Sequence, residues 1–408
     1  MGGVGPSPLH GGKRSMNICL DVRYRNESGS SSYINNIVPA ILKKDRNNRY
    51  FIIKYPKQKL LFERDVDEVI SSPAGTSDVV QLSWTIGFLP FLMRKKKVDI
   101  YHAMKMIGPI WPLTKSVVPM HSIYSSYKGQ FPLNLKTRVF IYLDGNRVVK
   151  RADHLIAVSD FVGEYLMEEF GIPREKIDVV YHGIDSSFQV YSAERISPVL
   201  KKFNLPANYV LCVGNVTPVK NHLTAVRALA NEKNRTDIHL VIAGDLGNAY
   251  AQRVREEIQA HGLSGRVSLL GFVAGTDLIS LMSGARLLLF PSLTEGCPVT
   301  MLEALKCGLP IVASKRGGLW DVGKDCCLFV EDPSDDKSFS AHMMNILNSD
   351  AFRDEMQKKA LRKASEFTWE KAAEAHIRSY EMVGESPCRR VEYKSHTVDF
   401  GFWKHRHP

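Results

Sequence analysis

Short apolar runs alternate with longer segments of helical periodicity along most of the chain. The runs are rich in β-branched residues, which is typical of strands buried on both faces. Helices are expected between them, for example over Phe161–Phe170 and Ala249–His261. This alternation predicts βαβ units and mainly parallel sheets. The predicted strands are Asn17–Leu20, Tyr50–Ile53, Ile100–His102, Val117–Met120, His154–Val158, Val179–Tyr181, Tyr209–Val213, Leu240–Ala243, Val267–Leu270, Leu287–Phe290, Ile311–Ala313 and Cys327–Val330.

Twelve strands are many for a single sheet, so we predict two doubly wound α/β domains. Regular patterning lapses over 182–198, which is the expected linker. A cleft between such domains, at the carboxyl ends of the strands, is the expected ligand site. The predicted boundaries are a flexible leader over 1–15, domains over 16–187 and 188–370, a helix over 371–385 with a crossing back to the first domain as one option, and an irregular basic tail over 386–408.

Composition narrows the class of protein. With 408 residues, 44% apolar and 24% charged, the chain is typical of a soluble globular protein and not of a disordered or disulfide-stapled one. The seven cysteines show no CxxC spacing and several lie in apolar runs, which favours reduced thiols in the cytoplasm. No apolar run approaches the ~18 residues that span a bilayer, and the first fifteen residues lack the apolar core of a secretory signal.

The net charge is +11, and most of the excess lies before residue 190. This asymmetry favours an anionic partner such as phosphate, a membrane surface or nucleic acid, although a generic basic surface fits equally well. The basic run Arg94–Lys97 follows the apolar stretch IGFLPFLM. It fits either a face that rests on an anionic membrane or the solvated end of a helix.

The segment Leu287–Pro310 carries the clearest chemical signal. An apolar strand ends at Pro291, a short loop follows, and a helix begins near Val299 and stops at Gly308. The free N–H groups of that helix start form an anion site. Glu295 in the loop and Glu303 one turn into the helix place two carboxylates beside it, where they can accept hydrogen bonds from sugar hydroxyls. On spacing alone, Glu303 could equally be an ordinary exposed helix residue.

The spacing from Glu295 to Glu303, within EGCPVTMLEALKCGLPIVAS, resembles the donor-binding signature of retaining GT-B glycosyltransferases. The family that this chain resembles most is the large glycosyltransferase family with the E-x7-E signature, which is like glycosyltransferase family 4, group 1. It includes bacterial enzymes of polysaccharide and lipopolysaccharide synthesis. The segments AVSDFV, GIPREKIDVVYHGID, VLCVGNVTPVKNHLTAVRAL, LVIAGDLG and RVSLLGFV also resemble that family. Together they extend over about residues 17 to 380.

The resemblance implies a role for each matching residue. Glu303 would hold the ribose hydroxyls of a nucleotide, and Glu295 would lie against the hydroxyls of the donor sugar. The amides of Val299 and Thr300 would meet the diphosphate. Lys220 would place its ammonium group on the same diphosphate and stabilise it as the leaving group; the alternative is a solvated lysine at a helix start. The second domain would thus bind a nucleotide-sugar and the first would bind the acceptor.

The first domain would supply the other wall of the cleft. Gly29, in the small-residue loop after the first strand, would contact a ligand through its backbone. His121, at the end of the fourth predicted strand, occupies the position of the family's histidine near the reacting sugar; a purely structural histidine is the alternative. The chain has Ser122 where the family has aspartate.

The basic loop of the second domain also departs from the family. Asn215 and Val219 stand where the family has an arginine beside its lysine. A basic group could come instead from Lys315 or Arg316. Together with Ser122, these departures support the alternative of a degenerate enzyme.

No metal site or cofactor is expected. Asp65 and Asp67 have the spacing of a DxD motif, but they lie in a charged amphipathic stretch and are interpreted as a solvated face. The leading hypothesis is a metal-independent retaining glycosyltransferase that moves a sugar from a UDP- or GDP-sugar to a sugar or lipid-linked acceptor, without nucleic acid. It would be cytoplasmic, with peripheral contact at the inner face of the membrane as an option. The alternatives are a GT-B sugar-nucleotide epimerase and a nucleotide-binding protein without catalysis.

Overall fold

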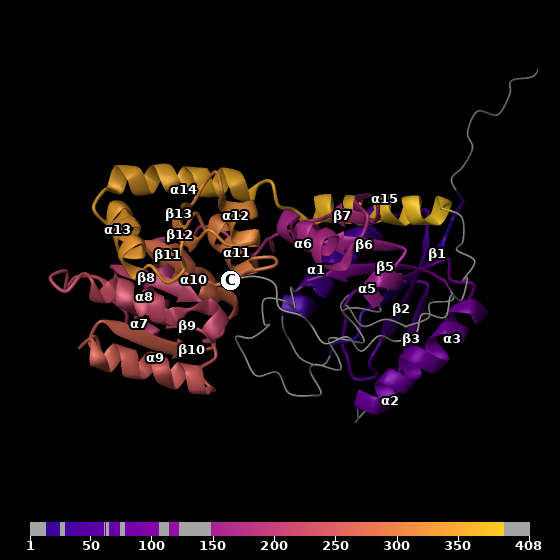
Figure 1. Ribbon diagram of the computed structural model, residues 1–408, viewed down its shortest axis with the longest axis horizontal. Helices are drawn as coiled ribbons and strands as arrows, with labels where there is room; N and C mark the ends of the chain where they lie inside the picture. Colours follow the sequence, from indigo (N-terminus) through magenta and orange to yellow (C-terminus); the bar gives the residue numbers. More distant parts are fainter. Residues whose placement is uncertain are drawn as a thin grey trace, which may run out of the picture.

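The computed structural model describes residues 14–24, 29–60, 62, 65–73, 78–105, 114–121 and 148–386. Two parallel sheets with flanking helices lie side by side (Figure 1). The predicted leader and basic tail lie almost wholly outside these residues, as does Ser122. In the part of the chain that is described, no helix is both long and apolar enough to cross a membrane.

The first sheet has seven described strands in the order β3-β2-β1-β4-β5-β6-β7. All of its pairings are parallel, for example Cys19 of β1 with Phe51 of β2. The order reverses between β1 and β4, so the carboxyl ends of these two strands form a topological switch point, where ligands bind in open α/β sheets. The strands are β1 Asn17–Asp21, β2 Arg49–Lys54, β3 Glu68–Ser71, β4 Ile100–Ala103, β5 Lys115–Met120, β6 His154–Ala157 and β7 Ile177–Val179.

Helices cover this sheet because each buries one apolar stripe against it. In α6, Val162 and Leu166 are fully buried, Ser159 caps the first turn and Gly171 ends the helix in the left-handed conformation. The described helical segments are α1 Gly29–Lys44, α2 Asp78–Ser83, the π-helix η2 Trp84–Phe88, α3 Leu89–Lys95, α5 Val149–Arg151, α6 Asp160–Phe170 and the 3-10 turn η5 Arg174–Lys176.

The second sheet has six strands in the order β10-β9-β8-β11-β12-β13, again all parallel. Its strands are β8 Tyr209–Val213, β9 His239–Ala243, β10 Val267–Gly271, β11 Leu287–Phe290, β12 Ile311–Ser314 and β13 Leu328–Val330. Its helical segments are α7 Ala193–Lys202, the 3-10 turn η6 Pro218–Lys220, α8 His222–Ala230, α9 Ala249–Ala260, α10 Gly275–Gly284, α11 Val299–Lys306, α12 Gly318–Gly323, α13 Asp336–Leu347 and α14 Asp350–Ala364.

The last described helix, α15 Trp369–Glu385, returns to the first domain. It packs along α1 (Figure 1), and it buries Tyr380 completely. The Tyr380 hydroxyl hydrogen-bonds His102 Nδ1 of β4 at 2.6 Å, and the Tyr33 hydroxyl of α1 hydrogen-bonds His376 Nε2 at 2.7 Å. The C-terminal helix therefore completes the core of the first domain.

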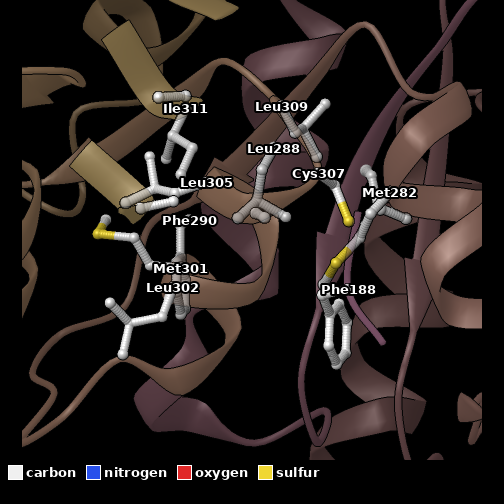
Figure 2. Packing of buried hydrophobic residues seen from close by; sticks show 14 of the residues in the cluster. Phe188, Met282, Leu288, Phe290, Met301, Leu302, Leu305, Cys307, Leu309 and Ile311 are labelled. Atoms are coloured by element: carbon white, nitrogen blue, oxygen red, sulfur yellow. The ribbon is translucent and has the colours of Figure 1, made fainter. Parts of the chain in front are cut away.

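A dense apolar cluster supports α11, which follows β11. Figure 2 shows Met301, Leu302 and Leu305 of this helix packed among side chains of β11 and β12. Leu288 and Ile311 contribute to the same cluster and are fully buried. Because interiors are close-packed, this support fixes the position of the first turn of α11 relative to the strand ends.

Candidate active site

We call residues 291–298, the loop between β11 and α11, the donor loop, because the sequence predicts a donor contact there. It begins at the carboxyl end of β11, where the sheet order reverses between β8 and β11. In Figure 1, α11 and α12 lie on the side of the second domain that faces α6 of the first. The donor loop is thus at the switch point of its own sheet and next to the other domain, where a ligand is expected.

The start of α11 leaves one backbone amide available. Pro298 precedes the helix, and no side chain caps it. The Val299 N–H donates to the Cys297 carbonyl at 3.0 Å, so this predicted ligand contact is already occupied. Among the described residues, the Thr300 N–H donates to no protein acceptor. Of the two predicted amides, Thr300 is the one available to a ligand, in the positive field of the helix N-terminus.

Lys220 and Glu295 meet directly. Lys220 ends η6, the turn after β8, and its Nζ lies 2.5 Å from Glu295 Oε1. Both side chains are largely buried, with 23% and 13% of their surface exposed. The Val219 carbonyl accepts the Leu293 N–H at 2.8 Å, which ties the two loops together. The residue predicted to bind the diphosphate, Lys220, and the residue predicted to bind the sugar, Glu295, are therefore paired with each other.

Glu303 lies one turn into α11 and is partly buried. Burial, together with the negative charge of Asp185, raises the pKa of Glu303 to about 8. Asp185 belongs to the segment that joins the domains, and no sequence pattern indicated that it lies near Glu303. The chemical consequence is that Glu303 is largely protonated at neutral pH until a ligand favours its carboxylate form.

His121 ends β5, where it is partly buried. Its ring packs edge-on against Tyr33 of α1, with 4.6 Å between ring centroids, and its Nε2 lies 3.1 Å from the Met104 carbonyl. Burial lowers the pKa of His121 to about 4, so the ring is neutral. A Cβ on Gly296 of the donor loop would lie 2.9 Å from the His121 carbonyl. Glycine at 296 thus lets the donor loop lie directly against the predicted histidine.

A second contact joins the domains beside this point. Asp321 of α12 accepts the Phe161 N–H, in the first turn of α6, at 2.8 Å. A Cβ on Gly317, which precedes α12 with φ 50°, would lie 2.7 Å from the Phe161 ring. The Gly318 N–H donates to the Glu295 carbonyl at 2.9 Å. The donor loop, α12 and α6 therefore form one connected contact across the cleft.

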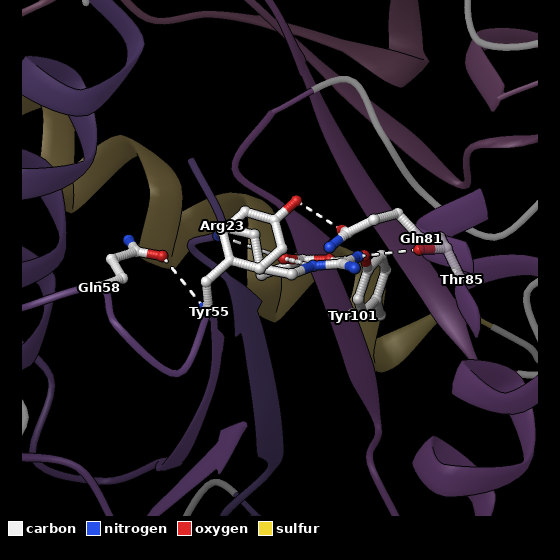
Figure 3. A network of polar contacts seen from close by, with 7 residues as sticks. Arg23, Tyr55, Gln58, Gln81, Thr85 and Tyr101 are labelled. Carbon is white, nitrogen blue, oxygen red and sulfur yellow. Dashed lines mark hydrogen bonds and ion pairs between the residues drawn. The ribbon is translucent and has the colours of Figure 1, made fainter. Parts of the chain in front are cut away.

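The loop after β1 contains a buried ion pair. Arg23 binds both carboxylate oxygens of Asp21, at 2.8 and 2.6 Å, and also donates to Thr85 at 3.1 Å (Figure 3). The Tyr101 hydroxyl donates to Asp21 at 2.6 Å. This network holds the carboxyl end of β1 rigid at the switch point. Asp21 and Arg23 are both buried, and their pairing compensates each charge in this apolar setting.

The predicted position of Gly29 was wrong. The sequence predicted it in the loop after the first strand, whereas α1 begins at Gly29. Serine and glycine favour the first positions of a helix over its interior, and the prediction started the helix later, at Ile34. Any ligand contact of Gly29 would therefore be made by the N-terminus of α1.

The two candidate substitute cations are placed differently. Lys315 ion-pairs with Glu331 at 2.6 Å and lies over the Trp320 ring. Arg316 is exposed and, within the described ranges, forms no ion pair. Asn215 is exposed as well. Lys220 thus remains the best-placed cation of the donor site.

Asp65 and Asp67 are both exposed. Asp67 accepts the Tyr50 N–H at 2.7 Å and Arg49 Nε at 3.1 Å, so it connects the start of β2 to the segment before β3. Groups of three or more histidine, cysteine or acidic side chains arranged to bind a metal are absent from the described part of the chain.

Several site residues gave no signal in the sequence. The segment after the basic pair Lys315-Arg316 contains Gly317, Gly318 and Asp321. Nothing in the spacing of these residues indicated a contact with α6. His182, in the segment between the domains, stacks on Tyr33 with centroids 4.8 Å apart, and its backbone hydrogen-bonds the Cys297 thiol. Such contacts are between segments remote in sequence, and only the domain arrangement reveals them.

Comparison with known proteins agrees with this geometry. The family model described as Glycosyl transferases group 1 matches residues 197–363, and the model described as Glycosyltransferase Family 4 matches residues 28–188. O-antigen chain mannosyltransferase B of Escherichia coli is 30% identical over 295 residues, which cover 71% of this chain and 76% of that protein. O-antigen chain mannosyltransferase RfbU of Salmonella typhimurium is 24% identical and covers 69% of this chain and 75% of that one.

Solved structures share the fold. A glycosyltransferase from Rickettsia africae has a TM-score of 0.72 at 18% identity and covers 91% of this chain and 100% of that one. HepE of Anabaena, in complex with UDP-glucose, has a TM-score of 0.71 at 20% identity with the same coverage. The chain therefore belongs to the group 1 glycosyltransferases of family 4. It is a glycosyltransferase with the GT-B fold, as the sequence predicted.

Proposed function

We propose that this protein is a retaining glycosyltransferase that moves a hexose from a nucleotide-diphospho-sugar to a hydroxyl of a glycan acceptor. The observation that carries the proposal is the pairing of Lys220 with Glu295 in the donor loop, which leads directly into the start of α11 and its free Thr300 amide. A cation and a helix N-terminus suit a diphosphate, and a carboxylate suits sugar hydroxyls. The names of the relatives, O-antigen mannosyltransferases, make mannose the first donor sugar to test.

The reaction would proceed by front-face displacement without an enzyme nucleophile. As the glycosyl bond breaks, negative charge develops on the departing diphosphate, and Lys220 with the Thr300 N–H would stabilise it. The diphosphate would help to remove the proton of the acceptor hydroxyl. Glu295 must leave Lys220 when the diphosphate arrives, and it is then free to accept hydrogen bonds from the donor sugar. Neutral His121 would line the acceptor side.

Glu303 gives the binding step a pH dependence. Its pKa is about 8, and its carboxylate form is the better acceptor for ribose hydroxyls. Below that pKa, binding must also remove a proton, so nucleotide affinity is expected to rise roughly tenfold per pH unit and to level off above the pKa. Calorimetric titration between about pH 6.5 and 9 measures this. Glu303→Gln should bind more weakly above the pKa and should lose the slope; a wild-type slope in that variant would remove Glu303 from the ribose site.

The acceptor and its location are also proposals. The relatives make O-antigen chains, so we propose a sugar or lipid-linked acceptor and a position at the cytoplasmic face of a membrane. Support comes from α3, where Leu89 and Met93 are buried against the sheet. Phe88, which ends η2 and precedes α3, and Phe91 of α3 are 56% and 68% exposed. These two are three residues apart and share a helix face.

The basic run continues this aromatic face. Arg94, Lys95 and Lys97 are exposed, whereas Lys96 is paired with Glu68 at 2.6 Å. Exposed aromatic rings beside unpaired cations fit the interface of an anionic bilayer, where each cation contributes about 1 kcal/mol. We call Phe88, Phe91, Arg94, Lys95 and Lys97 the α3 face.

Vesicle binding tests the α3 face. The protein is expected to co-sediment with vesicles that contain phosphatidylglycerol and not with vesicles of phosphatidylcholine alone. Phe88→Ser combined with Phe91→Ser should reduce the bound fraction severalfold. The matched control is Phe272→Ser, which removes another ring, 78% exposed, from the second domain. Equal binding of the double variant and the control would show that α3 is not the contact.

A thermal-shift panel of UDP, GDP and ADP tests the proposed donor class. A ligand at 100 times its Kd adds about 2.7 kcal/mol of stability. One of the three is expected to raise the melting temperature strongly, and Lys220→Ala should reduce that shift. If no nucleoside diphosphate stabilised the protein, the proposed donor would be wrong.

A further inference from the structure

Two adjacent cysteines form a thiol pair at the end of α12. Cys326 and Cys327 lie in the turn between α12 and β13, and their Sγ atoms are 3.8 Å apart. Cys326 is buried, and Cys327 is partly exposed as a residue. Nothing in the proposed transfer reaction uses either thiol.

The backbone holds the pair in place. The N–H groups of Cys326 and Cys327 both donate to the Gly323 carbonyl, each at 2.9 Å. A Cβ on Gly323 would lie 2.8 Å from Cys327 Sγ, so the last turn of α12 packs tightly against this thiol. The two sulfurs therefore face a common point with fixed spacing.

A nearby lysine favours reaction of the pair. The hydrogen bond from Cys327 and the positive charge of Lys363 lower the pKa of the Cys326 thiol, and Lys363 itself pairs with Glu366 at 2.7 Å and with Asp325 at 3.5 Å. The thiolate is the nucleophile and metal ligand of cysteine. One sulfur of the pair is thus poised to attack, with the second beside it.

Because the two cysteines are adjacent in the sequence, a direct disulfide bond between them would be strained. The Cα atoms of neighbouring residues are about 3.8 Å apart across a trans peptide, below the range of about 4.4–6.8 Å found in unstrained disulfides. A third atom that bridges the two sulfurs avoids this strain, and soft centres prefer sulfur ligands. We propose that Cys326 and Cys327 form a dithiol site that takes a trivalent thiophilic centre, of which arsenic(III) is the representative.

The reaction with phenylarsine oxide as the probe is balanced. Two S–H bonds and the arsenic–oxygen bond break, and two S–As bonds form. The oxygen leaves as water with the two thiol protons. Arsenic stays trivalent, so no oxidant or reductant is required.

Occupation of the site would act on the donor loop through α12. The Cys327 sulfur lies directly against the last turn of this six-residue helix at Gly323, so a bulky group bonded to the sulfur is expected to press on α12. The other end of α12 holds the Glu295 carbonyl through Gly318, and Asp321 holds Phe161 of the first domain. Inhibition of sugar transfer is therefore expected; this consequence rests on the proposed function, whereas binding at the dithiol does not.

Intact-protein mass spectrometry of the full chain with phenylarsine oxide tests the site. We expect one adduct per chain that is removed by ethanedithiol and survives a monothiol such as mercaptoethanol. Cys326→Ser and Cys327→Ser should each lose the dithiol-specific adduct, and Cys307→Ser, which removes a buried thiol elsewhere, should keep it. Cys327 is partly exposed, so its variant is informative if Cys326→Ser fails to fold.

The outcomes separate the two parts of the inference. An adduct that persists in both pair variants, or no adduct on the wild type, would overturn the site. If the adduct forms as expected but the rate of sugar transfer does not change, the coupling through α12 is wrong and the site stands. If the protein transfers no sugar at all, the proposed function fails and the adduct measurement is unaffected.

Discussion

Lys220→Ala is expected to lower kcat by ~10²–10³ and to leave the fold intact. The reason is electrostatic. Asn215 and Val219 occupy the positions where a second cation was expected, and Lys315 is paired with Glu331. Lys220 therefore contributes most of the positive charge that the side chains near the donor loop offer to a leaving diphosphate. Because that charge develops in the transition state, its loss should appear in the chemical step.

Single-turnover kinetics measures this effect, and the matched control is Lys233→Ala, which removes an exposed lysine after α8. A second variant checks the ion pair itself. Glu295→Gln frees Lys220 from its partner at 2.5 Å, so it should bind the nucleoside diphosphate more tightly while transferring sugar more slowly. Near-normal transfer by Lys220→Ala, with an unchanged melting temperature, would place Lys220 outside the site.

Acid is expected to destabilise the first domain by several kcal/mol between about pH 7.5 and 5. Four histidine rings lie together near Tyr33, and we call them the histidine cluster. They belong to His102, His121, His182 and His376. Burial lowers the pKa of His121 and of His376 to about 4, and it lowers the pKa of His102 and His182 well below the ordinary value of 6.5. The folded protein therefore holds all four rings neutral.

The direction follows from proton linkage. Above about pH 6.5 both the folded and the unfolded chain carry neutral histidines, so stability is constant. As the pH falls below 6.5, the unfolded chain binds protons that the cluster does not, and each buried imidazole costs about 1.4 kcal/mol per pH unit until its folded-state pKa is reached. At about pH 5 the loss in the free energy of unfolding is roughly 2 kcal/mol for each ring.

Urea unfolding at about pH 7.5 and pH 5 measures this difference. His376→Gln should reduce the pH-dependent part by about one quarter, whatever its effect at neutral pH. His261→Gln is the control. The His261 ring follows the C-terminus of α9, is more exposed than the rings of the histidine cluster, and pairs with Glu257. If His376→Gln and the wild type lost the same stability between the two pH values, His376 would not be held neutral in the folded protein.

The sequence predicted the fold well where burial dictates the pattern. Strands such as Tyr209–Val213 and Leu287–Phe290 have the predicted bounds because both faces are buried, and such strands are continuous apolar runs. β3, Glu68–Ser71, was missed, since it is an edge strand with alternate residues exposed and charged neighbours. The predicted linker was also wrong in its last part. α7 begins at Ala193, and a proline in its interior, Pro198, hides the helical pattern.

The candidate site could be predicted only where a local motif carries it. The helix start at Val299 and the spacing to Glu303 are local features, and the structure has α11 over Val299–Lys306. The pairing of Lys220 with Glu295 joins residues 75 positions apart. The contact of Asp321 with Phe161 depends on how the two domains lie against each other. Neither follows from spacing, because the chain reaches these contacts only through the packing of both sheets.

The anomeric configuration of the product tests whether this protein transfers a sugar from a nucleotide-diphospho-sugar with retention. The protein is incubated with GDP-mannose or UDP-glucose, with and without a mannose-terminated acceptor, and the products are followed by proton NMR. We expect one nucleoside diphosphate released per sugar transferred, only with acceptor present, and a new linkage with the anomeric configuration of the donor. An inverted linkage, an epimerised donor without acceptor, or nucleotide binding with no transfer would contradict this expectation.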